Sequence, residues 1–261
     1  MSGTSVHASV QAGHSHGQHA ETSVAPICTV FGIFFLLPCG FSALFVYHSI
    51  LLAVIFAGVG VPLLLFGISR WVSEGMAGVG ALGPSLAASG IPIFIISEIF
   101  IFLGLFASYW YVRLSAPAWP PAHTPYMPAA LPLLMTALLI ASSVTLHVGE
   151  QKLEHGDRSG FVGWLVLSLI LGALFLGCTG YEYTHLFGEG FTPGTNIFST
   201  IFFSITGFHA SHVLVGLLAF VTLLLPALGG RTNVTFTKCV SIYWHFVDVV
   251  WIFVVSQIYF W

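Results

Sequence analysis

Long apolar blocks, separated by short polar or proline- and glycine-rich breaks, dominate the pattern of this chain. Most blocks have about 20 residues or more, the length that an α-helix needs to cross roughly 30 Å of hydrocarbon. Seven blocks predict seven transmembrane helices, at residues 26–47, 50–70, 91–114, 129–149, 160–184, 196–225 and 239–260. The predicted fold class is therefore all-α, a polytopic membrane protein, because helices satisfy their own backbone hydrogen bonds in lipid.

The breaks between the blocks predict how the chain is divided. Only a few residues around His48 separate the first two blocks, so residues 26–72 are expected to form a two-helix transmembrane hairpin. Residues 73–90 are rich in Gly and Ser, which predicts a flexible linker. Residues 91–261 then form a five-helix transmembrane bundle, in which the proline-rich segment 115–128 is a stiff outside loop.

The first 25 residues have a different character. Residues 1–25 are polar and small, lack Lys and Arg, and contain His7, His14, His16 and His19. A secretory signal would need a basic start and an apolar core, and this stretch has neither. A metal-binding tract is an alternative, but HSHGQH lacks the fixed spacing of a structural zinc site. We therefore expect a disordered, His-rich cytoplasmic tail.

Composition strengthens the membrane assignment. Hydrophobic residues make up 57% of the chain and charged residues 6%, and the mean hydropathy is +0.96. Soluble domains have about 25% charged residues, so that class is excluded. The four cysteines, Cys28, Cys39, Cys178 and Cys239, are dispersed without a CxxC pair. They are expected to pack as small apolar side chains, not to form disulfides or an iron–sulfur site.

Basic residues predict the orientation, because short loops rich in Lys and Arg stay on the cytoplasmic side. With the amino end inside, the basic residues in or beside inside loops are Arg70, Lys152, Arg158, Arg231 and Lys238, and Arg113 alone lies outside. The amino terminus is therefore predicted to be cytoplasmic and the carboxyl terminus periplasmic. The base-free tail favours a bacterial plasma membrane over the mitochondrial inner membrane.

Ionisable side chains inside the apolar blocks are the candidate chemistry. They are Glu98, Glu182, His209, His212, His245 and Asp248. A charge at the bilayer centre costs from about 2.5 to more than 10 kcal/mol, so such groups are expected to face protein or water and to find partners. Desolvation penalises an ionised carboxyl group, so we expect Glu98 to be largely protonated or hydrogen-bonded across a helix interface. Its role stays open among a proton relay, a lipid-facing acid and a structural donor.

The histidines are paired by spacing. His209 and His212 lie three residues apart and share a helix face, and His245 and Asp248 repeat that spacing one block later. Imidazole binds zinc, copper and iron, and a carboxylate often orients it, so a metal or haem site is one interpretation. The dense aromatic residues around both pairs favour a buried polar network of His209, His212 and His245 instead, with no metal bound.

Four motifs resemble one known family. In chain order they are ISEIFIF (Ile96–Phe102), AWPPAHTP (Ala118–Pro125), GFHASHV (Gly207–Val213) and YWHFVDVVWIF (Tyr243–Phe253). Over residues 91–261 the chain resembles subunit III of cytochrome c oxidase. The resemblance implies a non-redox accessory subunit of a proton-pumping terminal oxidase that transfers electrons from cytochrome c to oxygen. No cofactor is then expected in this chain; haem and copper belong to catalytic subunit I, with subunit II in the same complex.

The resemblance also implies roles for acids and for lipid. Glu98 matches the carbodiimide-sensitive acid of the family and Glu182 the acid of the next buried motif, and with Asp248 they are expected to support proton uptake. The family fold splays a two-helix and a five-helix group into a V whose cleft holds phospholipids. Many members have a His-rich stretch before the third span and a basic residue late in the sixth, where this chain has ALGPSLAASG and Pro226. The remaining candidate lipid contacts are Arg70, Trp71, Glu74 and Arg231.

Two other functions are weighed against this one. Subunit III of a quinol oxidase or of a nitric oxide reductase-type complex shares the five-helix portion. Those relatives commonly lack the first two spans, so the hairpin favours the cytochrome c branch. An autonomous proton or ion transporter would use Glu98, Glu182, His209 and Asp248 as a relay. The sequence has neither the internal repeat nor the broken helix pair typical of many transporters.

Overall fold

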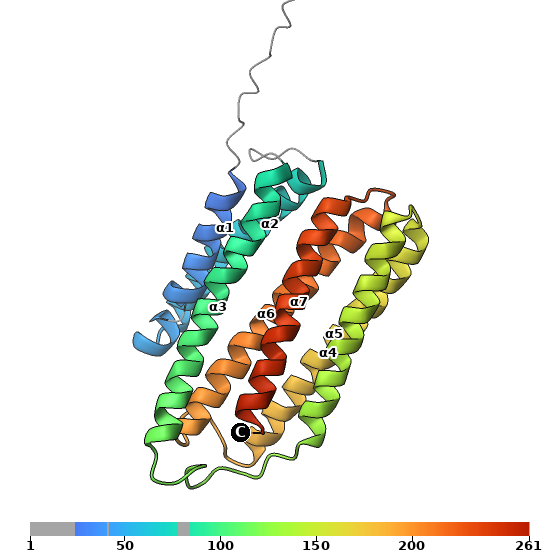
Figure 1. The fold of residues 1–261 in the computed structure, drawn as a ribbon. Helices are drawn as coiled ribbons and strands as arrows, with labels where there is room; N and C mark the ends of the chain where they lie inside the picture. Colours follow the sequence, from blue (N-terminus) through green and yellow to red (C-terminus); the bar gives the residue numbers. More distant parts are fainter. Residues whose placement is uncertain (1–23, 41, 78–83, 261) are drawn as a thin grey trace, which may run out of the picture. The chain divides into compact units, whose positions relative to one another are not determined.

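A computed structural model of the chain describes residues 24–40, 42–77 and 84–260 (Figure 1). This part is helical and contains no β-strand, which confirms the all-α class for the described residues. The elements are α1 (Ala25–Phe34), the π-helical turns η1 (Phe35–Cys39) and η2 (Ser42–Val46), α2 (Ile50–Ala77), α3 (Pro84–Ser115), α4 (Ala130–Glu154), α5 (Arg158–Gly188), α6 (Ile197–Leu228) and α7 (Val234–Ile258). The tail predicted at the amino end falls almost entirely outside the described residues.

The first predicted span, residues 26–47, is not one long helix. Helix α1 has only 10 residues, and the two π-helical turns follow it. Pro38 lies in η1, and a proline has no amide hydrogen to donate, which interrupts the hydrogen-bond pattern of a regular α-helix. Across the described ranges, six helices, α2 to α7, are long and apolar enough to cross a membrane, where the hydrophobic pattern predicted seven.

Several helices extend past their apolar blocks. Helix α2 reaches Ala77 and α3 begins at Pro84, so both ends of the linker expected at 73–90 are helical. Helix α7 begins at Val234, ahead of the predicted start at 239, because Asn233 caps it: the Asn233 side-chain oxygen accepts from the Phe236 amide at 3.1 Å. Hydropathy alone misses such ends, since capping residues are polar.

The described chain forms two compact units, one up to Ile68 and one from Ser69 onward. In the first unit α1 packs closely on α2 through glycines. A Cβ added at Gly32 would lie 2.6 Å from the Leu64 amide nitrogen, and one added at Gly67 would lie 2.7 Å from the Thr29 amide nitrogen. The two backbones approach closely, as small residues permit in membrane helix pairs.

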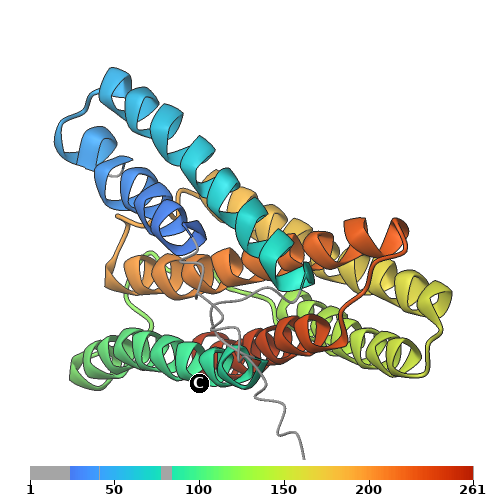
Figure 2. The ribbon, with the colours of Figure 1, turned by 90° about the horizontal axis from the view of Figure 1, so that it is seen from above.

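In the second unit α7 occupies the middle of the bundle. It packs against α3, α4 and α6, while α4 packs on α5 and α5 on α6. Helices α3, α7 and α4 lie side by side in one row, with α6 and α5 in another (Figures 1 and 2). In its most apolar stretch 61% of α7 is buried, whereas α6, the helix with the second highest buried share, reaches 33%. Side chains on α7 therefore decide how the other helices fit.

The proline-rich loop expected at 115–128 is held against the second unit by specific contacts. The Trp119 ring packs edge-on against Tyr109 and Phe198, with centroid distances of 5.8 and 5.3 Å. The Asn196 side-chain amide donates to the Ala122 carbonyl at 3.1 Å. The Asn196 side chain also caps α6 by accepting from the Ser199 amide at 2.8 Å. One residue thus joins the loop to the start of α6.

Two glycines make room for Trp244, one of the two buried tryptophans of α7. Trp244 is fully buried, and its indole N–H donates to the Ser142 hydroxyl on α4 at 3.0 Å. A Cβ added at Gly216 on α6 would lie 2.6 Å from the Trp244 ring, and one added at Gly172 on α5 would lie 2.8 Å from it. The ring therefore fills a slot that only glycine leaves open.

We expect Gly216→Ala to destabilise the second unit by about 1–3 kcal/mol, because the new methyl group overlaps a ring that has no free space to move into. The measurement is the thermal midpoint of the purified protein in detergent. The matched control is Gly177→Ala, where an added Cβ meets no atom within 4 Å. Equal midpoints for the two variants would contradict the close fit at Trp244.

Candidate functional site

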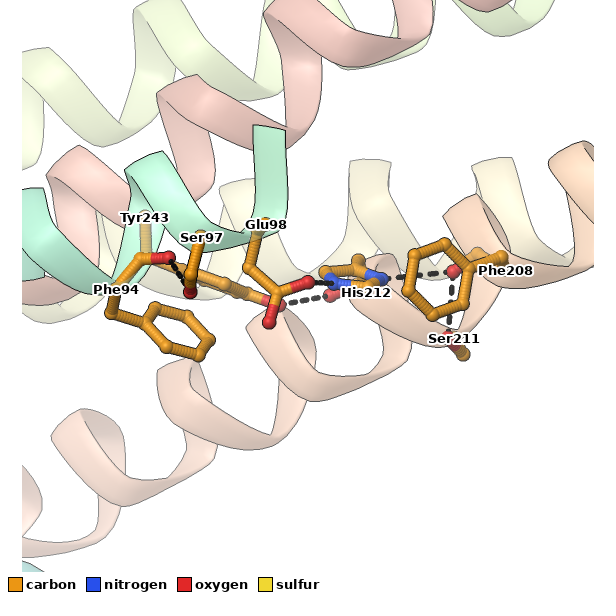
Figure 3. A network of polar contacts seen from close by, with 7 residues as sticks. All are labelled: Phe94, Ser97, Glu98, Phe208, Ser211, His212 and Tyr243. Atoms are coloured by element: carbon orange, nitrogen blue, oxygen red, sulfur yellow. Dashed lines mark hydrogen bonds and ion pairs between the residues drawn. The ribbon is translucent and has the colours of Figure 1, made fainter. Parts of the chain in front are cut away.

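Glu98 of α3 and His212 of α6 form a polar pair between two apolar helices. Glu98 Oε2 lies 3.0 Å from His212 Nε2, and the two side chains are 14% and 11% exposed. The acid expected to need a partner across a helix interface thus faces one of the predicted histidines (Figure 3). We call these two residues the Glu98–His212 pair.

The second ring nitrogen of His212 determines how protons are arranged in this pair. Nδ1 lies 2.9 Å from the Phe208 carbonyl oxygen, which can only accept, so Nδ1 carries a hydrogen. Nε2 then either accepts from a protonated Glu98 or, in an imidazolium, donates to the carboxylate. In both arrangements the pair shares one proton and is electrically neutral as a whole. A neutral pair is the form that an apolar surrounding tolerates.

Aromatic rings enclose the His212 ring. The centroids of Phe208 and Phe102 lie 4.6 and 5.3 Å from the imidazole centroid. The Tyr243 hydroxyl of α7 donates to the His212 carbonyl oxygen at 3.2 Å. Figure 3 shows Phe208 and Tyr243 beside the pair, with Ser97 and Ser211 each bonded to a carbonyl of its own helix. The rings exclude water on their side, which strengthens the hydrogen bond between acid and imidazole.

A second polar cluster joins α4 to α7. The Ser143 hydroxyl oxygen lies 2.8 Å from His245 Nδ1, and the same hydroxyl donates to Asp248 Oδ2 in a short contact. A hydroxyl has one hydrogen, so the His245 Nδ1–H donates to Ser143. The other ring nitrogen then accepts from Ser241, at 3.4 Å. Asp248 Oδ1 is buried and has no hydrogen-bond partner among the described residues.

His209 belongs to neither cluster. It is 1% exposed, and no hydrogen bond to either ring nitrogen joins it to another described residue. Its ring stacks on Trp251 at a centroid distance of 5.2 Å and meets Phe175 edge-on at 5.8 Å. The expectation of one network of three histidines therefore needs correction. His212 and His245 have partners in two separate places, and His209 is packed as an aromatic ring.

Glu182, near the end of α5, pairs with a residue just past the end of α7. The Tyr259 hydroxyl donates to Glu182 Oε2 at 2.8 Å, and Glu182 is 8% exposed. Burial raises the pKa of Tyr259 well above its usual value, so its phenol stays a neutral donor. The neighbouring Tyr183 bonds the Thr206 hydroxyl of α6 at 2.7 Å. Glu182 thus has a different hydrogen-bond partner from Glu98 and Asp248.

The candidate lipid contacts lie at helix ends. Arg70 pairs with Glu74 one turn later, at 3.5 Å, and Trp71 is 59% exposed. Arg231 is exposed in the turn between α6 and α7. Within the described residues, no group of three or more His, Cys, Asp or Glu side chains could hold a metal ion.

Sequence inspection missed the hydroxyl and aromatic partners of the ionisable residues. The Ser143 hydroxyl links His245 with Asp248, and the Tyr259 hydroxyl donates a hydrogen bond to Glu182. Two indole N–H groups of α7 also find hydroxyls on α4, Trp244 at Ser142 and Trp251 at Thr136, both at 3.0 Å. A signal was available: the stretch ASSVT, residues 141–145, places three hydroxyl groups together within an apolar span.

Known proteins match this chain over most of its length. The family described as Cytochrome c oxidase subunit III matches residues 73–261. A cytochrome c oxidase subunit 3 of Synechocystis sp. is 38% identical over 180 residues, which is 67% of this chain and 76% of the relative. A probable cytochrome c oxidase subunit 3 of Nocardia farcinica is 40% identical over 181 residues, 68% of this chain and 89% of the relative. The chain belongs to the cytochrome c oxidase subunit III family.

Membership of the subunit III family confirms the resemblance that the four motifs indicated. A cytochrome c oxidase subunit 3 of Mycosarcoma maydis, 33% identical over 220 residues, covers 78% of this chain. The family and the long apolar helices make the chain a multi-pass membrane subunit of a terminal oxidase, so its enzymatic activity is that of the complex. The matched range includes both polar clusters and Glu182, whereas Arg70 and Trp71 precede it.

A double-mutant cycle tests the Glu98–His212 pair. We expect His212→Phe to lower the free energy of unfolding by about 1–3 kcal/mol, because it leaves a buried carboxyl group without its partner. Adding Glu98→Leu removes that carboxyl group, so the double variant should be more stable than His212→Phe alone. Thermal midpoints of the purified protein give the comparison.

Ser211→Ala is the control for this cycle. Ser211 is adjacent to His212 but bonds only the Phe208 carbonyl of its own helix and is exposed, so its loss should change stability by at most about 0.5 kcal/mol. If the loss of stability in the double variant equals the sum of the losses in His212→Phe and Glu98→Leu, the two residues do not interact.

Proposed function

We propose that this chain is a non-redox accessory subunit of a proton-pumping terminal oxidase that transfers electrons from cytochrome c to oxygen. In this proposal it docks on catalytic subunit I, which holds the haems and copper, with subunit II in the same complex, and it stabilises the catalytic subunit. The observation that carries the proposal is the Glu98–His212 pair in a member of the subunit III family. An acid and an imidazole that share one proton inside the membrane suit a supporting role in proton supply.

Proton-uptake support is assigned first to Glu98. Its side chain and that of His212 keep some exposure, 14% and 11%, so a proton can be exchanged with a neighbouring subunit. Glu182 and Asp248 are more buried and hydrogen-bonded to Tyr259 and Ser143. We propose that Glu182 and Asp248 mainly stabilise the helix bundle around Glu98, and that proton exchange is their secondary role.

Phospholipid is the proposed ligand of this chain. An apolar groove of about 430 Å³ lies between α3 and α7, lined by Ile99, Phe102, Leu103, Phe106, Val249, Val250, Ile252, Phe253 and Ser256. An open apolar groove on the surface of a membrane protein suits an acyl chain. Arg70, Trp71, Glu74 and Arg231 are the proposed headgroup contacts, because basic and indole groups favour the membrane interface.

The proposed topology has seven spans, with residues 26–47 as the first and α2 completing a hairpin. In the second unit the α4–α5 and α6–α7 turns lie at one end, and the α3–α4 loop and the carboxyl end at the other (Figure 1). Lys152, Arg158, Arg231 and Lys238 belong to the first end, Arg113 to the second. The positive-inside rule supports the proposal that the first end faces the cytoplasm, and the proposed membrane is the bacterial plasma membrane.

Purification through a tag on this chain tests the proposed function. We expect haem and copper to co-purify in mild detergent and to stay wholly with the larger partner after this chain is stripped away. Optical spectra and metal analysis before and after stripping give the result. An unrelated membrane protein with the same tag is the control. Haem or metal retained by the isolated chain would make His209, His212 and His245 ligands and contradict the proposal.

Labelling by a hydrophobic carbodiimide tests the proton on Glu98. Such reagents need a protonated acid in an apolar site, so we expect faster labelling of Glu98 than of Glu189, whose carboxylate lies in an exposed loop near His185 at 3.7 Å. Mass spectrometry of peptides gives both rates, and Glu98→Gln should lose the fast label. Equal rates at the two acids would contradict a shared proton in the Glu98–His212 pair.

A further inference from the structure

Polar side chains line one end of the surface where α4 and α7 lie side by side. Starting from the α4–α5 turn, Glu154 Oε1 pairs with Lys238 Nζ at 2.6 Å, and the Gln151 amide bonds the His147 ring at 3.0 Å. We define the polar seam as Ser143, His147, Glu150, Gln151 and Glu154 on α4 with Lys238, Ser241 and His245 on α7. The seam ends at the Ser143 hydroxyl, with Asp248 buried behind it.

The seam belongs to the outer surface of the bundle. His147 and Gln151 are exposed, and Glu150 and His245 are half-buried. On α4 they continue an exposed stripe that includes Ile140 and Val144, because residues three or four apart share a helix face. The same surface is therefore polar toward the α4–α5 turn and apolar beyond it.

The seam also reaches into the depth of the bilayer. Helix α4 has 25 residues, about 37 Å at 1.5 Å per residue, and the hydrocarbon layer is about 30 Å thick. His147 lies seven residues from the end of α4, or ~10 Å, and His245 eleven residues from the start of α7, or ~16 Å. Both rings are thus inside the hydrocarbon layer, where facing lipid is costly.

Two exposed serines elsewhere in the described bundle bond to carbonyl groups of their own helices. Ser204 donates to the Thr200 carbonyl at 2.7 Å and Ser108 to the Gly104 carbonyl at 3.0 Å. The polar seam differs because it holds a carboxylate. No hydrogen bond or ion pair joins Glu150 to another described residue, although its charge acts on His245 and Lys238.

We propose that the polar seam is the surface on which the haem-containing subunit of the oxidase docks, through a transmembrane helix with a basic side chain opposite Glu150 and apolar side chains opposite Val144 and Ile140. Charge complementarity selects this partner. Glu154 is neutralised by Lys238, whereas Glu150 is not, and Asp248 behind the seam adds an acceptor oxygen without a partner in the described chain. The inference rests on the proposed function, since it names the docking face of the same complex.

Photo-cross-linking in membranes that hold the whole complex tests the docking face. A benzophenone side chain replaces Val144, 58% exposed, or, as a matched control, Val166 on α5, 36% exposed. The two valines lie ~15 Å and ~12 Å from the same α4–α5 end. We expect position 144 to give an adduct with the haem-containing subunit and position 166 to give none. Adducts with lipid alone at 144, or equal protein adducts at both positions, would overturn the proposal.

Substitutions give a second and independent readout. Glu150→Gln should lower the haem-containing partner retained per tagged chain about tenfold, the effect of losing one charge-assisted hydrogen bond. The control variants Glu189→Gln, in an exposed loop, and Val166→Trp should retain the haem-containing partner. The variant Val144→Trp should lose this partner. Retention unchanged by both Glu150→Gln and Val144→Trp overturns the docking face and leaves the proposed function intact. A wild-type chain that retains no haem-containing partner overturns the proposed function, and the docking face with it.

Discussion

Hydrogen bonding inside lipid is the constraint on which the rest of this structure depends, because a polar group that finds no partner there cannot turn to water. Helix α7 provides several of the hydrogen bonds that satisfy this constraint. Its two indole groups donate to hydroxyls of α4, and its Tyr243 hydroxyl reaches a carbonyl of α6. Each bond contributes only about 1 kcal/mol, but together they define which residues of α4, α6 and α7 lie opposite one another.

Packing reinforces the same arrangement. Helices in lipid gain little from hydrophobic burial against each other, so close contact of small and large residues has to hold them. The Trp244 ring fits against Gly172 and Gly216, on two different helices. The Glu98–His212 pair depends on this fit, because Tyr243, next to Trp244, bonds the His212 carbonyl. The candidate site is therefore a consequence of where α7 lies.

Much of the fold could be predicted from hydrophobic pattern alone. Six apolar blocks became helices α2 to α7, and the ionisable residues that stood out in them are mostly buried. The errors have a common origin. An apolar block ends at the first polar residues, yet Asn233 starts α7 by capping it, and α4 runs on through Glu154. The apolar block at 26–47 predicts one continuous helix, although Pro38 interrupts it.

The sequence by itself determined the class of protein, the places of the helices and the residues that need partners, because length, hydropathy and charge act locally. Four motifs sufficed to indicate the family. Only the tertiary structure decided which partners those residues have: His212 for Glu98, Ser143 for Asp248, Tyr259 for Glu182 and a stacked indole for His209. These pairs join residues far apart in the chain, and helix packing rather than local spacing brings them together.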